Sequence, residues 1–330
     1  MEYVTAIVFF FGKLFHPLPL FDISLGLLAI VNLFKNHKIK NKFFLYFIFF
    51  SLISARFSNL ISFFYFIRLA VLLSFFIFPP KFSQKFKQFF VIIIVANILF
   101  GLIQYFLWPN FTYFSALNWD PHLFRLVSTF FDPTFTGLIY LLFIIFLFFQ
   151  SLPFYYFIIP YLALSLTYSR SSLLSFLIAF FIIAKQYQKP RIFFISLLIF
   201  LSTIFILPRL EGEGTKLERT SSILAKIENY KEGISIFSKN PVFGVGYNNL
   251  KYARNLSNNP SHSTYGFDGS LLTILTTTGL IGFILFVLGL REYFQKTDSL
   301  HRILLITIIF HSLFSNSLLY PFVIFCLLVF

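Results

Sequence analysis

The stretch VIIIVANILFGLIQYFL, residues 91–107, decides the class of this protein, because no residue in it carries a charge. A helix of about 20 such residues crosses the roughly 30 Å hydrocarbon core of a bilayer. Similar apolar runs recur along the chain, for example at 138–149 with its flanks and at 192–207. The sequence therefore predicts an all-α polytopic membrane protein.

The composition supports that prediction. Of the 330 residues, 58% are hydrophobic and 12% are charged, whereas a soluble domain carries about 25% charged residues. We interpret most of the 54 phenylalanines as lipid-facing substitutes for leucine. The single cysteine, Cys326, excludes a disulfide framework and a thiolate metal site.

The net charge of +14 would suggest nucleic-acid binding in a soluble protein. Here the basic residues gather in four short loops, which are typical of the cytoplasmic side of a membrane. We therefore expect no nucleic-acid partner. The loops contain Lys35, Lys38, Lys40 and Lys42; Lys81, Lys85 and Lys87; Lys185, Lys189 and Arg191; and Arg291, Lys296 and Arg302.

Placing these loops in the cytoplasm fixes the expected topology. It predicts about twelve transmembrane helices in one domain, 1–330, in the cytoplasmic (inner) membrane, with both ends inside. The largest extracytoplasmic loop, 208–265, lies between the ninth and tenth spans. The expected spans are 3–15, 18–34, 43–58, 60–79, 89–108, 129–149, 152–168, 171–187, 191–208, 267–290, 303–316 and 317–330.

The large loop is predicted to be partly helical. Hydroxyls at 220–222 suit a helix start, apolar residues then recur at helical spacing, and Asn240-Pro241 ends the pattern. The helix either lies on the outer bilayer surface or packs on the bundle. NPVFGVGYNN, residues 240–249, follows it and could offer backbone N–H groups to an anion.

Several arginines are expected at the outer face. LTYSRSSLL places Ser169 and Arg170 in a short outer turn, RLVSTFFDPTFTG begins with Arg125, and RLEGEGTKLERTSS supplies Arg209 and Arg219. Guanidinium groups hold phosphate through paired, charge-assisted bonds, so the group suggests a site for a phosphate-headed lipid. The alternative is that each arginine extends to lipid headgroups.

SHSTYGFDGS, from 261, places a histidine just before the tenth span. His262 could act as a base near neutral pH, oriented by Tyr265 and Asp268, or it could be a loop residue without a role.

With only 12 acidic residues and no paired acidic motif on the outer face, we expect no catalytic metal and no cofactor. Arg68 lies inside a predicted span, where a charged residue suggests a functional role. The sequence does not predict which residue it pairs with.

Taken together, RLVSTFFDPTFTG, LTYSRSSLLSF, NPVFGVGYNN and SHSTYGFDGSLLTILTTTGLIG resemble, in order and spacing, the bacterial O-antigen ligase and O-antigen polymerase superfamily. The resemblance is strongest over 125–282. It implies a lipid-dependent glycosyltransferase-like fold and a metal-independent, inverting transfer. The donor would be a glycan on undecaprenyl diphosphate, and the acceptor a glycan, a lipid A-core or a protein.

The resemblance also implies roles for particular residues. Arg170 matches the arginine of the family's Ser-Arg motif, and Arg219, less securely Arg209, matches its loop arginine. These would cradle the diphosphate, with Arg125 nearby. His262 matches the family histidine that assists the acceptor hydroxyl.

One other function class stays open. A transporter or flippase for a lipid-linked or anionic solute would also have about twelve spans and an intramembrane arginine, although the two halves of the chain show no clear repeat. The sequence does not separate a ligase from a polymerase, because both remove a glycan from the same lipid.

Overall fold

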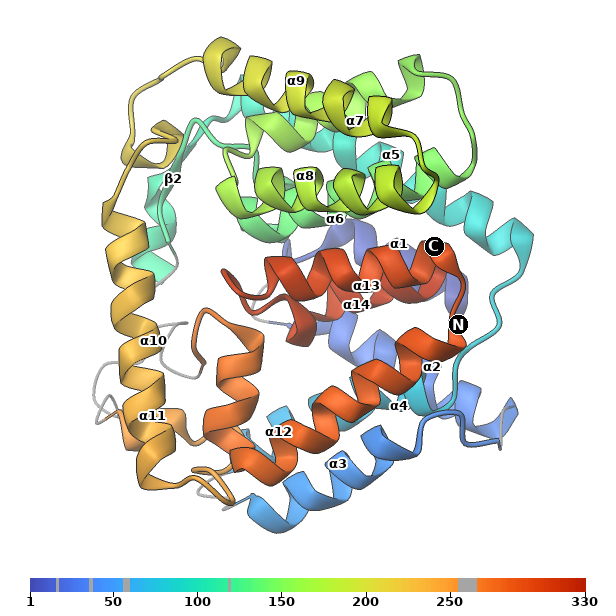
Figure 1. The fold of residues 1–330 in the computed structure, drawn as a ribbon, viewed down its shortest axis with the longest axis vertical. Helices are drawn as coiled ribbons and strands as arrows, with labels where there is room; N and C mark the ends of the chain where they lie inside the picture. The colour runs from blue at the N-terminus through green and yellow to red at the C-terminus, as the bar shows by residue number, and fades with distance from the viewer. Residues whose placement is uncertain (16–17, 36–37, 56–59, 118–119, 255–265) are drawn as a thin grey trace.

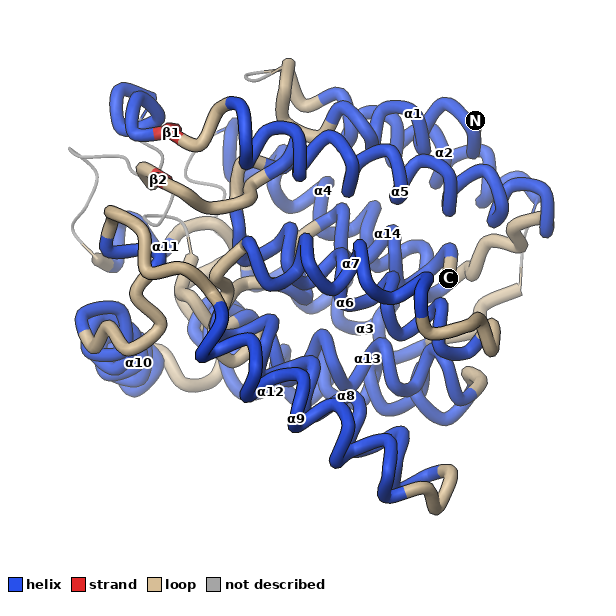
Figure 2. Tube along the Cα trace, turned by 90° about the horizontal axis from the view of Figure 1, so that it is seen from above, coloured by secondary structure: helices blue, strands red, loops and turns tan. Residues whose placement is uncertain are grey.

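The computed structural model describes residues 1–15, 18–35, 38–55, 60–117, 120–254 and 266–330. The structure is mostly helical, about 75%, and its long helices lie side by side in layers (Figures 1 and 2). The two ends of the chain lie at one end of this bundle, and the short strands β1 (Asn110–Phe111) and β2 (His122–Leu123) lie at the opposite end (Figure 2).

A helix lies within or across every predicted span. These helices are α1 (Glu2–Phe11), α2 (Leu20–Lys35), α3 (Lys42–Ser54), α4 (Leu60–Ile77), α5 (Gln84–Leu107), α6 (Pro133–Phe149), α7 (Tyr155–Leu166), α8 (Arg170–Gln186), α9 (Pro190–Ile206), α12 (Ser270–Lys296), α13 (Ser299–His311) and α14 (Pro321–Val329). By length and apolarity, α4, α5 and α12 are long enough to cross a membrane. That the shorter helices also cross it stays a prediction.

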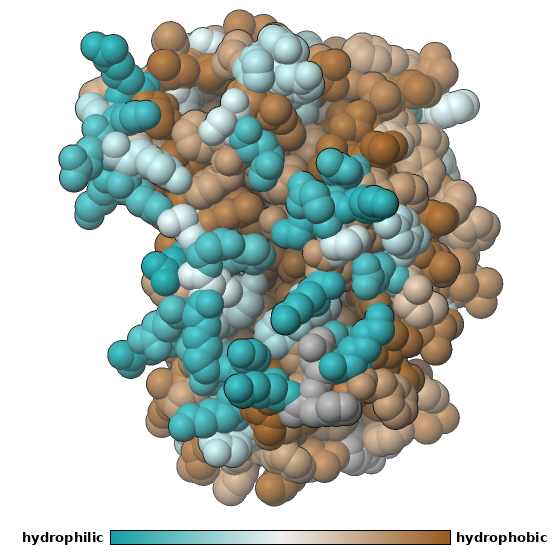
Figure 3. Space-filling model, turned by 90° about the vertical axis from the view of Figure 1, so that its right-hand side faces the viewer, coloured by the Kyte–Doolittle hydropathy of each residue, from teal (hydrophilic) through white to brown (hydrophobic). Residues whose placement is uncertain are grey.

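The basic loops mark the end of the bundle that carries the termini. Hydrophilic side chains gather over the left and centre of this face, and apolar ones cover most of its right side (Figure 3). We call this face the basic end and the opposite one the far end. The arrangement agrees with the charge pattern from which the topology was predicted, whereas the outward orientation of the far end stays a prediction.

The core is built around α6, in which almost every residue is buried, and α14 packs against it. Phenylalanine contributes much of this core. Phe9, for example, makes edge contacts with Phe90 and Phe130, with ring centroids 5.1 and 5.3 Å apart. The interpretation of phenylalanine as mainly lipid-facing is therefore wrong for this inner set, which has no exposed surface available to lipid.

Helix α12 is broken at Gly279, where the backbone leaves helical geometry (φ 67°, ψ −168°). The segment 240–246 provides hydrogen-bond partners for the backbone groups that the break leaves unpaired. The Val245 and Gly246 N–H groups donate to the Thr276 and Thr277 carbonyls at 3.0 and 2.9 Å, and the Leu280 N–H donates to the Pro241 carbonyl at 2.8 Å. Broken helices at membrane depth persist only when such partners satisfy the freed groups.

These contacts also correct one expectation. The Val245 and Gly246 N–H groups are engaged by α12, so they are not offered to an anion. The glycines of NPVFGVGYNN serve a close backbone approach instead, because a Cβ on Gly244 would lie 2.4 Å from the Thr277 carbonyl carbon.

The predicted loop helix is confirmed as α10 (Ser221–Lys239), which spans the far end of the bundle (Figure 1). Its isoleucines at 223, 227 and 234 are 48%, 46% and 57% exposed, whereas Lys226 and Tyr230 reach the helical bundle. An apolar face turned away from the protein suits a helix at a bilayer surface. A short helix, α11 (Leu250–Ala253), follows.

Candidate substrate-binding site

The short turn between α7 and α8 builds the first part of the site. Tyr168 adopts φ 52°, and Ser169 caps α8 by accepting a hydrogen bond from the Ser172 N–H at 3.3 Å. Its hydroxyl also bonds those of Ser171 and Ser172. The supporting residue Ser169 is thus buried and holds the turn that places Arg170 as the first residue of α8.

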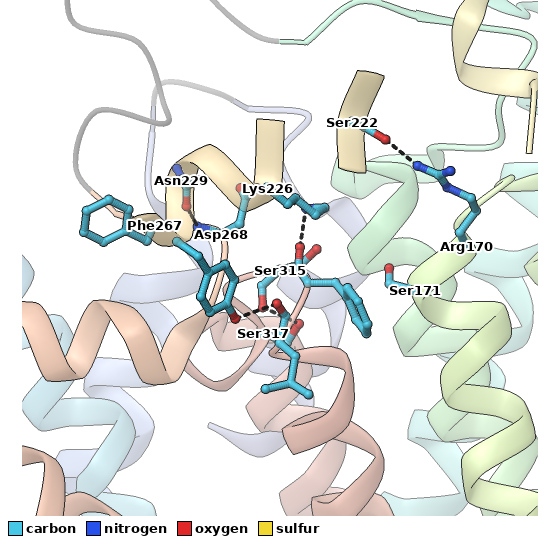
Figure 4. Close-up of polar contacts among 12 residues, drawn as sticks. Arg170, Ser171, Ser222, Lys226, Asn229, Phe267, Asp268, Ser315 and Ser317 are labelled. Atoms are coloured by element: carbon cyan, nitrogen blue, oxygen red, sulfur yellow. Dashed lines mark hydrogen bonds and ion pairs between the residues drawn. The ribbon is translucent and has the colours of Figure 1, made fainter. Parts of the chain in front are cut away.

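Arg170 reaches from α8 to the loop before α10. Its Nη1 donates to the Leu217 and Arg219 carbonyls at 3.2 and 2.6 Å, and its Nη2 donates to the Ser222 hydroxyl (Figure 4). One guanidinium therefore fixes the backbone that carries Arg219, even though the two arginines are 49 residues apart. The predicted meeting of these two arginines is present in the structure.

Arg219 is partly held by its own loop. Its Nη1 donates to the Gly214 and Lys216 carbonyls at 2.7 and 2.9 Å. Its Nε and Nη2 make no hydrogen bond to the residues that the structure describes, so they remain available to a ligand. Burial, and then the positive charge of Arg170, shift its pKa below the usual range, and the Glu213 carboxylate opposes this shift.

Arg125 is the buried member of the group, with 9% of its surface exposed. Its Nε donates to the Thr167 carbonyl at 2.9 Å, just before the Ser-Arg turn. Burial lowers its pKa to about 9, with Arg219 the next cause, so the group stays protonated at neutral pH. We call Arg125, Arg170 and Arg219 the arginine cluster.

Arg209 lies at the edge of this cluster. Its side chain is 69% exposed and pairs with Glu218 at 3.6 Å, which is a weak surface interaction. It lines a cavity of about 280 Å³ together with Arg170. Thr215, Leu217 and Glu218 also line it, and the rest of the lining is apolar and comes from α8, α9 and the residue after α9: Leu173, Leu174, Phe200, Ile204 and Leu207. The cavity therefore combines charged groups with a largely hydrocarbon lining, which suits an amphiphile.

The predicted residues near the tenth span are only partly described. His262 and Tyr265 lie outside the described residues. Asp268 pairs with Lys226 of α10 at 3.0 Å, and its N–H donates to the Asn229 side chain at 2.9 Å (Figure 4). Asp268 thus ties α10 to the start of α12, and its predicted role toward His262 stays a prediction.

Lys226 was not singled out as a site residue by the sequence. Besides Asp268, its Nζ bonds the Phe314 carbonyl at 2.5 Å, in the turn between α13 and α14. Its position on the polar face of an amphipathic helix predicted only a solvated side chain. In the structure it is a further cation at the far end.

His311 is the second residue that sequence reasoning missed. It is fully buried at the end of α13. Its Nε2 lies 3.1 and 3.2 Å from the Ser171 and Ser172 hydroxyls, and its Nδ1 lies 2.6 Å from the Ser317 hydroxyl. A lone histidine in an apolar run carries no local signature of such a network, which holds the first turn of α8 against the α13–α14 turn.

Within the described ranges, no three histidine, cysteine or acidic side chains come together as metal ligands would. The prediction that the reaction needs neither metal nor cofactor is not tested by this arrangement.

Comparison with known proteins adds one finding. A family model described as O-antigen ligase matches residues 155–287, and no curated protein matches the chain. The matched stretch holds α7 to α10, Arg170, Arg219 and most of α12. It suggests glycan transfer of the ligase or polymerase type. The match supports the resemblance of the chain to the O-antigen ligase and O-antigen polymerase superfamily.

Proposed function

We propose that this protein transfers a glycan from undecaprenyl diphosphate to an acceptor hydroxyl at the outer face of the cytoplasmic membrane. The observation that carries the proposal is the cavity that Arg170 and Arg209 line together with apolar residues, with Arg219 and Arg125 beside it. Guanidinium groups next to a hydrocarbon lining suit a lipid whose head is a diphosphate.

The chemistry follows from that placement. The acceptor oxygen forms a bond to the anomeric carbon of the glycan while the bond from that carbon to the diphosphate oxygen breaks. The bonding electrons leave with the diphosphate, whose added charge Arg170 and Arg219 stabilise. His262 takes the proton of the acceptor hydroxyl. Attack opposite the leaving group inverts the anomeric carbon, and the diphosphate supplies the free energy without a nucleotide.

The transporter reading has one observation in its favour. Arg68 of α4 pairs with Asp22 of α2 at 2.8 Å, and such intramembrane pairs occur along solute pathways. A transporter of an anionic lipid would bind the same headgroup without cleaving it, so an assay that detects glycan cleavage separates the two functions.

Binding of the bare lipid tests the diphosphate site. Purified protein in mild detergent is incubated with undecaprenyl diphosphate or with undecaprenol, which lacks the diphosphate, and the complexes are measured by native mass spectrometry. We expect undecaprenyl diphosphate to bind at least about tenfold more tightly, because charge-assisted bonds contribute about 1.5–3 kcal/mol each. Equal retention of the two lipids would mean that the arginine cluster does not bind the diphosphate headgroup.

A further inference from the structure

A second group of charged side chains lies at the far end, on elements that the arginine cluster does not use. The Arg68 Nε donates to the Asp22 carboxylate at 2.8 Å, with about a third of each side chain exposed (32% and 31%). The Arg68 guanidinium also lies 5.8 Å from the centroid of the Tyr65 ring. Asp22 is therefore the partner that the sequence could not name.

Lys13 and Asp132 extend this group. Lys13 follows α1, and its Nζ lies 5.6 Å from the centroid of the Tyr320 ring. Asp132, Arg68 and Asp22 all lie within electrostatic range of Lys13. We call Lys13, Asp22, Arg68, Asp132 and Tyr320 the polar cluster. Its two cations and two anions balance, whereas the arginine cluster is strongly positive.

The Tyr320 hydroxyl is the unexplained member of the polar cluster. The residue is 8% exposed, and its hydroxyl is buried without a hydrogen-bond partner among the described residues. Asp132, Arg68 and Asp22 lie within electrostatic range of it, and its ring stacks on Phe135 with centroids 3.9 Å apart. Four residues earlier, the buried Asn316 Oδ1 also lacks a partner within the described part of the chain. Such groups are rare in folded proteins and call for a ligand or a water.

The chemistry of the polar cluster selects the class of ligand. Balanced charges give no preference for an anion. Carboxylates accept hydrogen bonds, ammonium and guanidinium groups donate them, and a phenol does both. A sugar ring offers several hydroxyls that donate and accept, and bonds from hydroxyls to carboxylates are charge-assisted. The polar cluster therefore suits an uncharged, hydroxyl-rich ligand.

The two clusters adjoin each other at Asp132. This residue lies within electrostatic range of both Arg125 and Lys13, and its carboxylate caps α6 by accepting from the Thr134 and Phe135 N–H groups. We propose that the polar cluster binds an uncharged sugar ring of one of the two substrates, next to the diphosphate held by the arginine cluster. The proposal rests on the proposed function. The ring belongs either to the donor glycan or to the acceptor.

Tyr320→Phe is the sharpest variant, because it removes only the hydroxyl that has no partner in the described protein. Loss of such a group leaves folding intact or improves it, so we expect an unchanged or higher melting temperature. The matched control is Tyr293→Phe, which alters another buried tyrosine, near the basic end of α12.

The first arm tests the donor as the source of the sugar. Native mass spectrometry compares undecaprenyl diphosphate with the same lipid carrying N-acetylglucosamine. If the donor sugar occupies the polar cluster, wild type prefers the sugar-bearing lipid. Tyr320→Phe then weakens binding of that lipid about three- to tenfold and leaves the bare lipid unaffected.

The second arm tests the acceptor. Saturation-transfer difference NMR measures free glucose, galactose, mannose, rhamnose and N-acetylglucosamine on the detergent-solubilised protein. An acceptor site gives signals that Tyr320→Phe reduces and Tyr293→Phe does not.

If Tyr320→Phe changes neither measurement, the polar cluster holds only water and the inference is overturned. Failure of the proposed function gives a different result, because wild type would then either fail to retain bare undecaprenyl diphosphate or bind the lipid-linked glycan without cleaving it.

Discussion

Arg170→Ala and Arg219→Ala should each weaken binding of undecaprenyl diphosphate by about 10- to 100-fold. A guanidinium bond to phosphate is charge-assisted and contributes about 1.5–3 kcal/mol, which corresponds to that range. Arg170 should show the larger loss, because it also holds the backbone of the loop that carries Arg219. Native mass spectrometry of each variant, titrated with the lipid, measures the effect.

Two controls separate charge from architecture. Arg191→Ala removes an exposed arginine at the basic end and should leave binding unchanged. Arg170→Lys keeps a positive charge but loses the planar fork, so we expect binding between that of wild type and Arg170→Ala. If Arg191→Ala weakens binding as much as the cluster variants do, the lipid is held by net charge alone and the cluster has no special role.

Gly279→Ala should prevent the protein from folding. The residue adopts φ 67° and ψ −168°, a conformation that is essentially restricted to glycine and costs other residues about 1–3 kcal/mol. An added Cβ would also lie 2.2 Å from the Val242 carbonyl oxygen, which is backbone and cannot turn aside. Together these should remove most of a stability of about 5–15 kcal/mol. The yield of monodisperse protein by size-exclusion chromatography measures the loss.

Gly26→Ala is the matched control for that variant. Gly26 lies inside α2, and an added Cβ would meet nothing within 4 Å. Alanine is about 1 kcal/mol more favourable than glycine in a helix, so its yield and melting temperature should equal or exceed those of wild type. A Gly279→Ala protein that behaves like Gly26→Ala would refute the broken-helix geometry of α12.

The apolar runs and basic loops predicted the helices well, because length and charge act through local rules. The loop helix could also be predicted, since hydroxyls, helical spacing and Asn240-Pro241 all lie within one stretch. The break at Gly279 could not, because a glycine in an apolar run has the same local pattern whether it packs against a helix or bends the backbone.

The site was predicted less completely. Arg170 and Arg219 were matched through family motifs, and the structure brings them together. The network of His311 and the pairing of Arg68 with Asp22 were not predicted, because both depend on residues far apart in the chain. No periodicity or spacing encodes such contacts, which arise only when the helices pack.

The most direct test of the central claim is a transfer assay with purified protein and lipid-linked glycans extracted from cells that produce it. Release of undecaprenyl diphosphate and appearance of the glycan on an acceptor are both measured by mass spectrometry, for wild type and for His262→Ala. We predict that wild type yields both products and that His262→Ala retains the lipid but forms neither. If wild type binds the lipid-linked glycan without ever cleaving it, the protein is not a glycan transferase.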